Sequence, residues 1–223
     1  MSKRIFITAT NTNVGKTYTT VKLMEAYTKM GFRVGVYKPI ETGVNGLPAD
    51  GSLLLKRAQS LNPEFQLLRI HNIVSLSLAL PAAPYVANKG KKVDLAQFDR
   101  ALEKIESLCD IVLIEGAGGP MVPIDDELMM LDLAHHFKAV TLLVSHCKLG
   151  CINDTLLSLS ALENADISPL WALNCLPEDD TFAQVSLPYF KKKFNSLFLI
   201  GHDNTALAQA LLDKINQQNS QGT

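Results

Sequence analysis

Short apolar runs alternate with helix-like segments along most of this chain. Runs of mainly aliphatic residues without polar alternation are typical of strands that are covered on both faces. Such runs predict strands at 5–7, 33–37, 111–114, 139–144, 170–174 and 197–200. Apolar spacing and helix-end signals predict helices at 18–30, 52–59, 94–107, 130–137, 154–163, 181–194 and 205–216. This alternation predicts an α/β fold with a mainly parallel central sheet and helices on both faces.

Three segments fall outside this alternation. Residues 45–51 are rich in glycine and polar residues and are predicted to form a loop. Residues 60–92 mix apolar residues with prolines, and no element is predicted there. Residues 217–223 are polar and are predicted to be disordered. Because the alternation otherwise continues without a break, we expect one domain over residues 1–223.

The composition limits the classes of partner. The chain has 21 Lys and Arg against 22 Asp and Glu, a net charge of -1, and no basic stripe. Nucleic acids and anionic membranes are therefore not expected as partners. No apolar run approaches the roughly 18 residues of a membrane span. The basic N-terminus is followed by an apolar run too short for a signal peptide, so we expect a cytoplasmic protein.

The cysteines give no sign of a disulfide framework. Cys109, Cys147, Cys151 and Cys175 show no CxxC spacing and lie on or beside strand-like runs. We therefore predict reduced thiols, as is usual in the cytoplasm. Cys147 and Cys151 could form a metal cluster with His146, but zinc usually needs four well-spaced ligands. A metal site there is not favoured.

The strongest candidate site lies between the first predicted strand and the first predicted helix. Residues 9–17 read Ala-Thr-Asn-Thr-Asn-Val-Gly-Lys-Thr and have the context of a phosphate-binding loop. Gly15 would allow the backbone close to an anion, Lys16 adds positive charge, and the Thr17 hydroxyl suits magnesium. The strict motif has Gly where this chain has Thr10. The alternative is therefore an ordinary glycine turn before a helix.

Two charged residues stand at the carboxyl ends of predicted strands. Lys38 follows the second strand, and Glu115 closes the run 111–114 before a glycine-rich turn. Ligands of open parallel sheets bind at this edge, so we expect Lys16, Lys38 and Glu115 to meet there. The Glu115 carboxylate would hold magnesium directly or through water. Taken singly, each residue could instead be an incidental strand end, and an isolated Lys is commonly just solvated.

A second anion site is conceivable before the helix at 154–163. The sequence Lys-Leu-Gly-Cys-Ile-Asn at 148–153 places small residues where helix N–H groups are free. The simpler interpretation is an N-cap by Asn153 or Asp154. From the pattern alone, the cap is favoured.

Four motifs taken together resemble the dethiobiotin synthetase family, the ATP-dependent carboxylating ligases of biotin biosynthesis. They are Thr-Asn-Thr-Asn-Val-Gly-Lys-Thr at 10–17, Tyr-Lys-Pro at 37–39, Glu-Gly-Ala-Gly-Gly at 115–119 and Lys-Leu-Gly-Cys-Ile-Asn at 148–153. The first and third are shared with other P-loop ATPases, whereas the second and fourth are more specific. The resemblance covers residues 3–174 and implies a P-loop NTPase fold.

The resemblance also implies a reaction. Its substrates are 7,8-diaminopelargonate, CO2 or bicarbonate, and ATP, and its products are dethiobiotin, ADP and phosphate. One amine captures CO2 as a carbamate, which takes the γ-phosphate, and the second amine then closes the ureido ring. Lys16 and Lys38 would be catalytic, because cations must gather carbamate and phosphates. The implied Mg2+ ligands are Thr17, Asp50 and Glu115.

The resemblance assigns further binding roles by position. The implied nucleotide-binding residues are Asn13, Val14, Gly15, Lys16, Thr17, Tyr18, Asp50, Glu115, Gly116, Ala117, Gly118 and Asn174. The implied substrate-binding residues are Thr12, Lys38, Thr42, Gly150, Cys151, Ile152, Asn153 and Tyr189. In the family, the segment matching 150–153 binds the substrate carboxylate from the neighbouring subunit. A homodimer with sites shared between two chains is therefore expected.

Two segments depart from the family. Residues 80–85 read Leu-Pro-Ala-Ala-Pro-Tyr, where the family often carries an acidic residue, a Ser and a His. Residues 200–204 replace a segment that binds the nucleotide. The second departure predicts weak selection of the base, so that ATP and other nucleoside triphosphates serve as substrates.

Two other classes share this type of core. Partitioning or division-site switch ATPases carry a second lysine early in the loop, where this chain has Asn11, and often a basic amphipathic tail, where it has Gln-Gln-Asn-Ser at 217–220. Cobyrinic acid amidases carry an added glutaminase domain, for which the chain has no room. Both classes are disfavoured.

Overall fold

The computed structural model describes residues 3–179 and 181–221, and the strands of these residues form a six-stranded sheet. The strands are β1 (Lys3–Ala9), β2 (Val34–Thr42), β3 (Val74–Leu78), β4 (Ile111–Glu115), β5 (Val140–His146) and β6 (Leu170–Asn174). Their order is β3-β2-β4-β1-β5-β6, and each neighbouring pair is parallel. The predicted α/β fold with a parallel sheet is confirmed.

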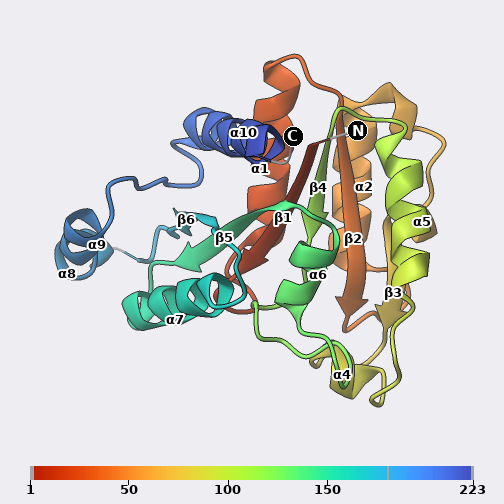
Figure 1. Cartoon of the computed structure of the whole chain (residues 1–223), viewed down its shortest axis with the longest axis horizontal. Helices are drawn as coiled ribbons and strands as arrows, with labels where there is room; N and C mark the ends of the chain where they lie inside the picture. The colour runs from red at the N-terminus through yellow and green to blue at the C-terminus, as the bar shows by residue number, and fades with distance from the viewer. Residues whose placement is uncertain (1–2, 180, 222–223) are drawn as a thin grey trace.

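Helices cover both faces of the sheet (Figure 1). They are α1 (Lys16–Lys29), α2 (Ala49–Leu61), α3 (Ile70–Ile73), α4 (Pro84–Ala87), α5 (Leu95–Glu106), α6 (Met130–His136), α7 (Cys151–Glu163), α8 (Phe182–Val185), α9 (Leu187–Lys193) and α10 (Asn204–Gln221), with a 3-10 turn at Pro63–Phe65. On one face, α1 packs between α2 and α10. Helices α5, α6 and α7 lie on the other face.

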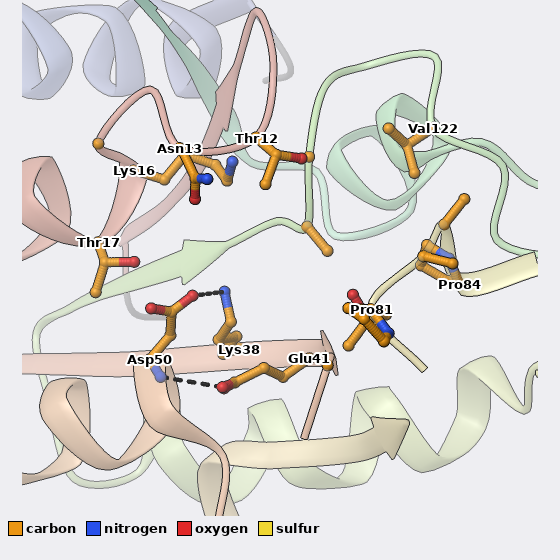
Figure 2. Close-up of a pocket in the computed structure, with 17 residues that line it drawn as sticks. Thr12, Asn13, Lys16, Thr17, Lys38, Glu41, Asp50, Pro81, Pro84 and Val122 are labelled. Atoms are coloured by element: carbon orange, nitrogen blue, oxygen red, sulfur yellow. Dashed lines mark hydrogen bonds and ion pairs between the residues drawn. The ribbon is translucent and has the colours of Figure 1, made fainter. Parts of the chain in front are cut away.

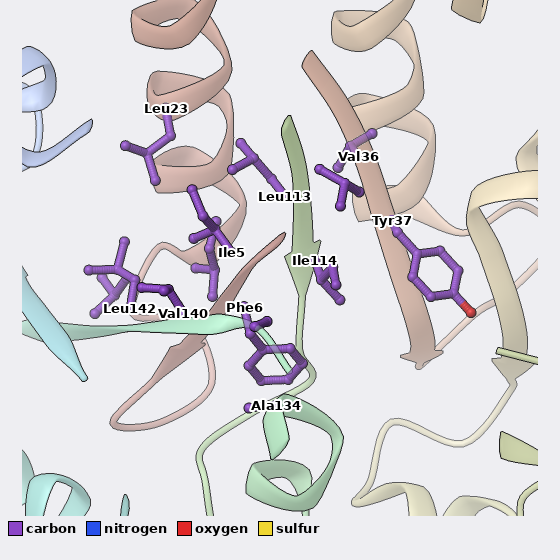
Figure 3. Close-up of a cluster of buried hydrophobic side chains, with 14 of the residues drawn as sticks. Ile5, Phe6, Leu23, Val36, Tyr37, Leu113, Ile114, Ala134, Val140 and Leu142 are labelled. Atoms are coloured by element: carbon purple, nitrogen blue, oxygen red, sulfur yellow. The ribbon is translucent and has the colours of Figure 1, made fainter. Parts of the chain in front are cut away.

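The core lies in the two layers between sheet and helices. Successive strand residues point to opposite faces, as strand geometry requires. Figure 3 shows Ile5 and Leu113 directed toward α1 and α2, whereas Phe6 and Ile114 point away from these helices, Phe6 toward Ala134 of α6, and Tyr37 points toward β3. These side chains are all buried. Burying a large apolar side chain contributes about 1.5–3 kcal/mol, so this alternation fixes both the sheet and the strand ends that carry the site.

Two strand predictions were wrong. Residues 74–78 form the edge strand β3, which was missed although its apolar residues alternate with serines as in a half-buried strand, because it lies in a segment that prolines otherwise interrupt. Residues 197–200 do not form a strand, although Leu199 makes an isolated parallel bridge to Leu173. The backbone there touches β6 only briefly before the chain turns into α10. An apolar run of strand length therefore marks burial in this case, not a sheet position.

Two predictions near the C-terminus were also wrong. The helix expected at 181–194 is two short helices, α8 and α9, separated at Ser186. Pro188 lies in the first turn of α9, the part of a helix where proline is tolerated. Helix α10 extends to Gln221, so residues 217–221 are helical instead of disordered, and 222–223 lie outside the described residues.

The prediction of reduced cysteines was wrong for one pair. Cys147 and Cys175 form a disulfide, whereas Cys109 and Cys151 are free and buried. The residues just before the bonded pair, His146 and Asn174, face each other in the parallel register of β5 and β6. The two cysteines therefore leave adjacent strand ends together, which their separation of 28 residues could not reveal.

No helix within 3–179 and 181–221 combines the length and apolar character that crossing a membrane requires.

We expect the disulfide to stabilise the fold. Replacing Cys147 by Ser should lower the free energy of unfolding by about 3–4 kcal/mol, because the bond closes a loop of 28 residues in the unfolded chain. Urea unfolding with and without a reductant measures this, and the reductant should have no further effect on the variant. Four alkylatable thiols in protein denatured without reductant would contradict the assignment.

Candidate functional site

A cavity of about 760 Å³ opens at the carboxyl ends of β1, β2 and β4 (Figure 2). It is lined by Thr12, Asn13, Gly15, Lys16, Thr17, Lys38, Glu41, Thr42, Gly43, Asp50, Pro81, Ala82, Ala83, Pro84, Ala117, Gly118 and Val122. This is the edge at which open parallel sheets bind ligands. The cavity therefore lies where the sequence predicted it and gathers ten of the predicted site residues.

The loop between β1 and α1 has the backbone of an anion-binding turn. Asn13 and Gly15 have positive φ angles of 59° and 99°, and α1 begins directly after Gly15. Any side chain at residue 15 would collide with the amide of Asn174. The Asn174 Nδ2 donates a hydrogen bond to the Val14 carbonyl oxygen at 2.9 Å. Asn174, at the end of β6, thus supports the loop by this hydrogen bond. Because its side chain fills the space next to residue 15, only glycine fits there.

The central charged pair joins two neighbouring strands. The Lys38 Nζ donates to Glu115 Oε1 at 2.6 Å, and both residues are almost fully buried. The Thr17 hydroxyl donates to Oε1 at 3.0 Å, and the Thr20 hydroxyl donates to Oε2 at 2.7 Å. Burial by itself would lower the pKa of Lys38, but Glu115 and then Asp50 outweigh it and raise that pKa. Lys38 is therefore a buried ammonium throughout the neutral range.

Lys16 lies in a different electrostatic position. Burial, and next the charge of Lys38, lower its pKa to about 8 against the opposing effect of Glu115 and Asp50. Its Nζ donates to the Asn11 carbonyl oxygen at 3.3 Å. This loop therefore holds a cation without a close carboxylate partner of its own, as suits a site for an anion such as a phosphate.

The position of Asp50 differs from the expected loop. Asp50 lies in the first turn of α2, which begins at Ala49, inside the predicted loop 45–51. Its carboxylate is 3.5 Å from the Lys38 Nζ. Asp50 and Glu115 therefore place two carboxylates against a single ammonium group, and the Thr17 hydroxyl bonds one of them, Glu115. Figure 2 shows the Asp50 carboxylate beside the Lys38 ammonium group.

This oxygen set fits magnesium bound with a nucleotide. Mg2+ usually takes one or two carboxylates together with phosphate oxygens and water. Within 3–179 and 181–221, no three His, Cys, Asp or Glu side chains gather closely enough to hold a metal ion alone. The carboxylates and hydroxyl at this site are therefore suited to an ion that arrives with phosphates.

Glu41 is a cavity residue that the sequence analysis missed. Its carboxylate accepts the Asp50 N–H at 3.0 Å and the Gly51 N–H at 2.8 Å, and only 6% of the residue is exposed. Burial raises its pKa despite these hydrogen bonds. An acidic residue inside an otherwise buried strand is unusual, and this feature of the sequence could have identified Glu41 as a candidate site residue. Figure 2 shows it reaching the start of α2.

Residues 80–85, the segment whose sequence differs from the family pattern, contribute one wall of the cavity. Pro81, Ala82, Ala83 and Pro84 line it, and Val122 lies beside Pro84 on the same side. A side chain at Gly43 would press against Pro81, whose Cβ would lie 3.2 Å away. This wall is apolar, in contrast to the charged floor made by Lys38 and Asp50.

Several predicted residues are not among the described residues that line this cavity. They are Val14, Tyr18, Glu115, Gly116, Gly150, Cys151, Ile152, Asn153, Asn174 and Tyr189. Glu115 still bonds to the lining residues Lys38 and Thr17, whereas Val14 and Asn174 bond to each other behind the phosphate-binding loop. The Tyr18 hydroxyl lies beside Gly201, on the other side of the phosphate-binding loop.

Residues 150–153 and Tyr189 belong to another part of the surface. The segment begins α7, with Gly150 at φ 94° and its N–H groups at the helix start. Tyr189 is 39% exposed on α9, which lies beyond β6 (Figure 1). The structure therefore does not bring these residues to the cavity of the same chain.

Comparison with protein families and curated proteins gives consistent matches. A family model described as an AAA domain matches residues 3–202. The ATP-dependent dethiobiotin synthetase BioD of Sulfurovum sp. (strain NBC37-1) is 44% identical over 193 residues, 85% of this chain and 90% of that protein. The protein of the same name from Wolinella succinogenes is 40% identical over 216 residues, 96% and 100% of the two chains.

Solved structures share the fold at low sequence identity. The MinC:MinD cell division protein complex of Aquifex aeolicus matches with a TM-score of 0.54 and 18% identity, over 98% of this chain and 96% of that chain. A plasmid partition protein from Borrelia burgdorferi gives 0.54 at 11% identity, over 97% and 99%. At these identities the likeness concerns the fold alone.

Proposed function

Because this chain belongs to the family of ATP-dependent dethiobiotin synthetases, we propose that its cavity holds 7,8-diaminopelargonate next to the phosphates of ATP. The observation that supports this placement best is the buried Lys38–Glu115 pair beside the phosphate-binding loop. A charged floor facing an apolar wall at 81–84 suits a diamine on an aliphatic chain. We place Thr12 and Thr42 as its polar contacts.

The reaction needs two nucleophilic steps by the diamine and one phosphoryl transfer. A neutral amine attacks CO2, forms a C–N bond and loses a proton, leaving a carbamate. A carbamate oxygen then attacks the γ-phosphorus, and the bond from phosphorus to the ADP oxygen breaks. The second amine attacks the carbamate carbon, the C–O bond to phosphate breaks, and the lost proton goes to phosphate or solvent.

The cations of the cavity would bring the anions of this sequence together. We assign Lys16 to the phosphates and Lys38 to the carbamate and the transferring phosphoryl group. Fixed cations that face developing negative charge stabilise a transition state without reorganisation at the moment of reaction. Lys38 is suited to this role because its partners Glu115 and Asp50 keep it charged.

We propose that Thr17, Asp50 and Glu115 hold Mg2+. The ion would neutralise phosphate charge and orient the terminal phosphates. Thr17 and Thr20 already fix the Glu115 carboxylate by hydrogen bonds, so this ligand is positioned before an ion arrives. The nucleotide itself would bind to Asn13, Val14, Gly15 and Tyr18 and to the turn 116–118, with Asn174 toward the base.

We further propose a homodimer in which residues 150–153 reach the cavity of the partner. Their N–H groups at the start of α7 suit the substrate carboxylate, with Tyr189 assisting. Exposed apolar side chains near that helix support this arrangement, since Leu149, Leu157 and Met121 are 93%, 63% and 58% exposed. Leu157 and Met121 border a surface groove of about 320 Å³ beside the phosphate-binding loop.

We propose a cytoplasmic location on the basis of the substrate. ATP is a cytoplasmic metabolite, and its use favours that compartment. The Cys147–Cys175 disulfide is uncommon there, so the cysteines do not support the location as the sequence analysis expected.

The proposed reaction is tested by phosphate release with Mg2+ and ATP. We expect release only when both bicarbonate and 7,8-diaminopelargonate are present. Lys38→Ala should lower kcat by roughly 10²–10³, because it removes a cation that stabilises the transition state. The Lys38→Ala variant should still bind a fluorescent ATP analogue, which also shows that it is folded. The matched control is Lys92→Ala, which removes a lysine from an exposed ion pair. Release indifferent to the diamine would refute the proposal and favour a nucleotide switch.

The shared site is tested by an interface variant. Leu157→Asp should shift the protein to monomers and raise the KM for the diamine, because a charge in an apolar interface is costly. Analytical ultracentrifugation and steady-state kinetics measure the two effects. Leu67→Asp, at a residue 86% exposed after the 3-10 turn, is the control. A wild-type monomer with full activity would exclude the shared site.

The nucleotide base is expected to be weakly selected. The Asn174 side-chain amide already donates a hydrogen bond to the Val14 carbonyl oxygen, and residues 200–204 form a tight turn beside Tyr18. Turnover with GTP and CTP should therefore lie within about tenfold of that with ATP, a difference of about one hydrogen bond. Rates at saturating nucleotide measure this, and strict ATP dependence would show that a base pocket exists.

A further inference from the structure

The N-terminus of α2 is capped from another element. Pro48, which precedes the helix, has no side-chain oxygen with which to cap it. Instead, Glu41 in β2 accepts the N–H of Asp50 through Oε1 at 3.0 Å and the N–H of Gly51 through Oε2 at 2.8 Å. The free N–H groups of a helix start need acceptors, and here one buried carboxylate supplies both oxygens.

The fit between this helix end and the sheet is tight. A Cβ at Gly51 would collide with Val74 of β3 and lie 3.1 Å from Glu41 Oε2. Glu41 is only 6% exposed, so its carboxylate is held among these groups. The first turn of α2 therefore rests on the carboxyl-terminal part of β2 and on the first residue of β3.

We propose that Glu41 is a positioning residue for the magnesium site, acting through Asp50. The side chain of Asp50 is about half exposed (51%), so its location depends on the backbone that carries it. That backbone is fixed by the Glu41 hydrogen bond, and the Asp50 carboxylate then lies 3.5 Å from the Lys38 Nζ. This inference rests on the proposed function only in that Asp50 is a ligand of nucleotide-bound magnesium.

The contacts distinguish this role from catalysis. Glu41 hydrogen-bonds backbone N–H groups of α2, and it stands three residues after Lys38 on the same strand. Strand β2 thus carries Lys38 and, through Glu41, also fixes the position of the Asp50 carboxylate that faces Lys38. A shift of β2 would move both together, so their relative placement is preserved.

The test is a double-mutant cycle read by Mg2+-dependent binding of ADP, measured by calorimetry. Glu41→Gln preserves size but turns one acceptor toward N–H groups into a donor. The Mg2+ concentration for half-maximal binding should rise about tenfold, as for other partners that orient a metal ligand. Binding of ADP without Mg2+ should change less than about twofold, because Asp50, the assigned residue that Glu41 contacts, is placed on the ion and not on the phosphates or the base.

Asp50→Asn should raise the Mg2+ requirement by a comparable factor. The double variant should require no more Mg2+ than Asp50→Asn alone, because residues that act through one another are not additive. The inference would be overturned if the double variant raised the Mg2+ requirement by the product of the two single effects. It would also be overturned if Glu41→Gln left the Mg2+ requirement unchanged.

A matched control separates this role from general loss of a helix cap. Asp94 caps α5 by accepting the Ala96 N–H at 3.0 Å, and it is not a cavity residue. Asp94→Ala removes this cap and should leave the Mg2+ requirement unchanged, even where both variants melt at lower temperature. A shift in this control equal to that of Glu41→Gln would assign the effect to stability and overturn the inference.

The outcome is independent of the diamine assay. If wild-type protein binds Mg2+ and ADP but releases no phosphate with the diamine, the proposed function fails while the cycle still decides the role of Glu41. If the synthetase reaction proceeds and the cycle is additive, only the role of Glu41 fails.

Discussion

The Lys38–Glu115 ion pair sets requirements that the surrounding structure meets. Removing two charges from water costs several kcal/mol each, and only close geometry with further hydrogen bonds offsets this cost. Here the ammonium and carboxylate meet at 2.6 Å because β2 and β4 are neighbours in the sheet. The hydroxyls of Thr17 and Thr20 in α1 donate further hydrogen bonds to the Glu115 carboxylate oxygens. The pair and its hydrogen bonds thus tie β2 and β4 to the first turns of α1.

The cavity combines this satisfied pair with a less satisfied cation. Lys38 has carboxylates on two sides, whereas Lys16 is buried near the like charge of Lys38, which helps to lower its pKa to about 8. An arriving phosphate would relieve that repulsion. The cation available to an anion, Lys16, and the cation held charged by carboxylates, Lys38, are therefore two parts of one charge arrangement.

The charged groups at strand ends could be predicted from the sequence, whereas the groups placed by tertiary contacts could not. Lys16, Lys38 and Glu115 follow apolar runs, and the parallel fold brings such ends to one edge, so their meeting was predictable. Glu41 carries no such pattern, because its partners are backbone groups of a helix that only the fold places beside it. Asp50 was assigned from the resemblance, but its place in a helix was hidden by the glycine and proline around it. The edge strand β3 does carry an alternating apolar pattern, but this pattern is only five residues long and lies in a segment interrupted by prolines, so it was not recognised.

The Cys147–Cys175 disulfide has a topological consequence. It closes a covalent ring that contains α7 and all of β6. The start of α7, which we assign to the partner's substrate, and Asn174, which supports the phosphate-binding loop, are thus members of the same ring. A protease that cuts once between residues 148 and 174 would open the ring without dividing the molecule. The nicked chain would remain a single covalent unit, and its two fragments would part only after the bond was reduced.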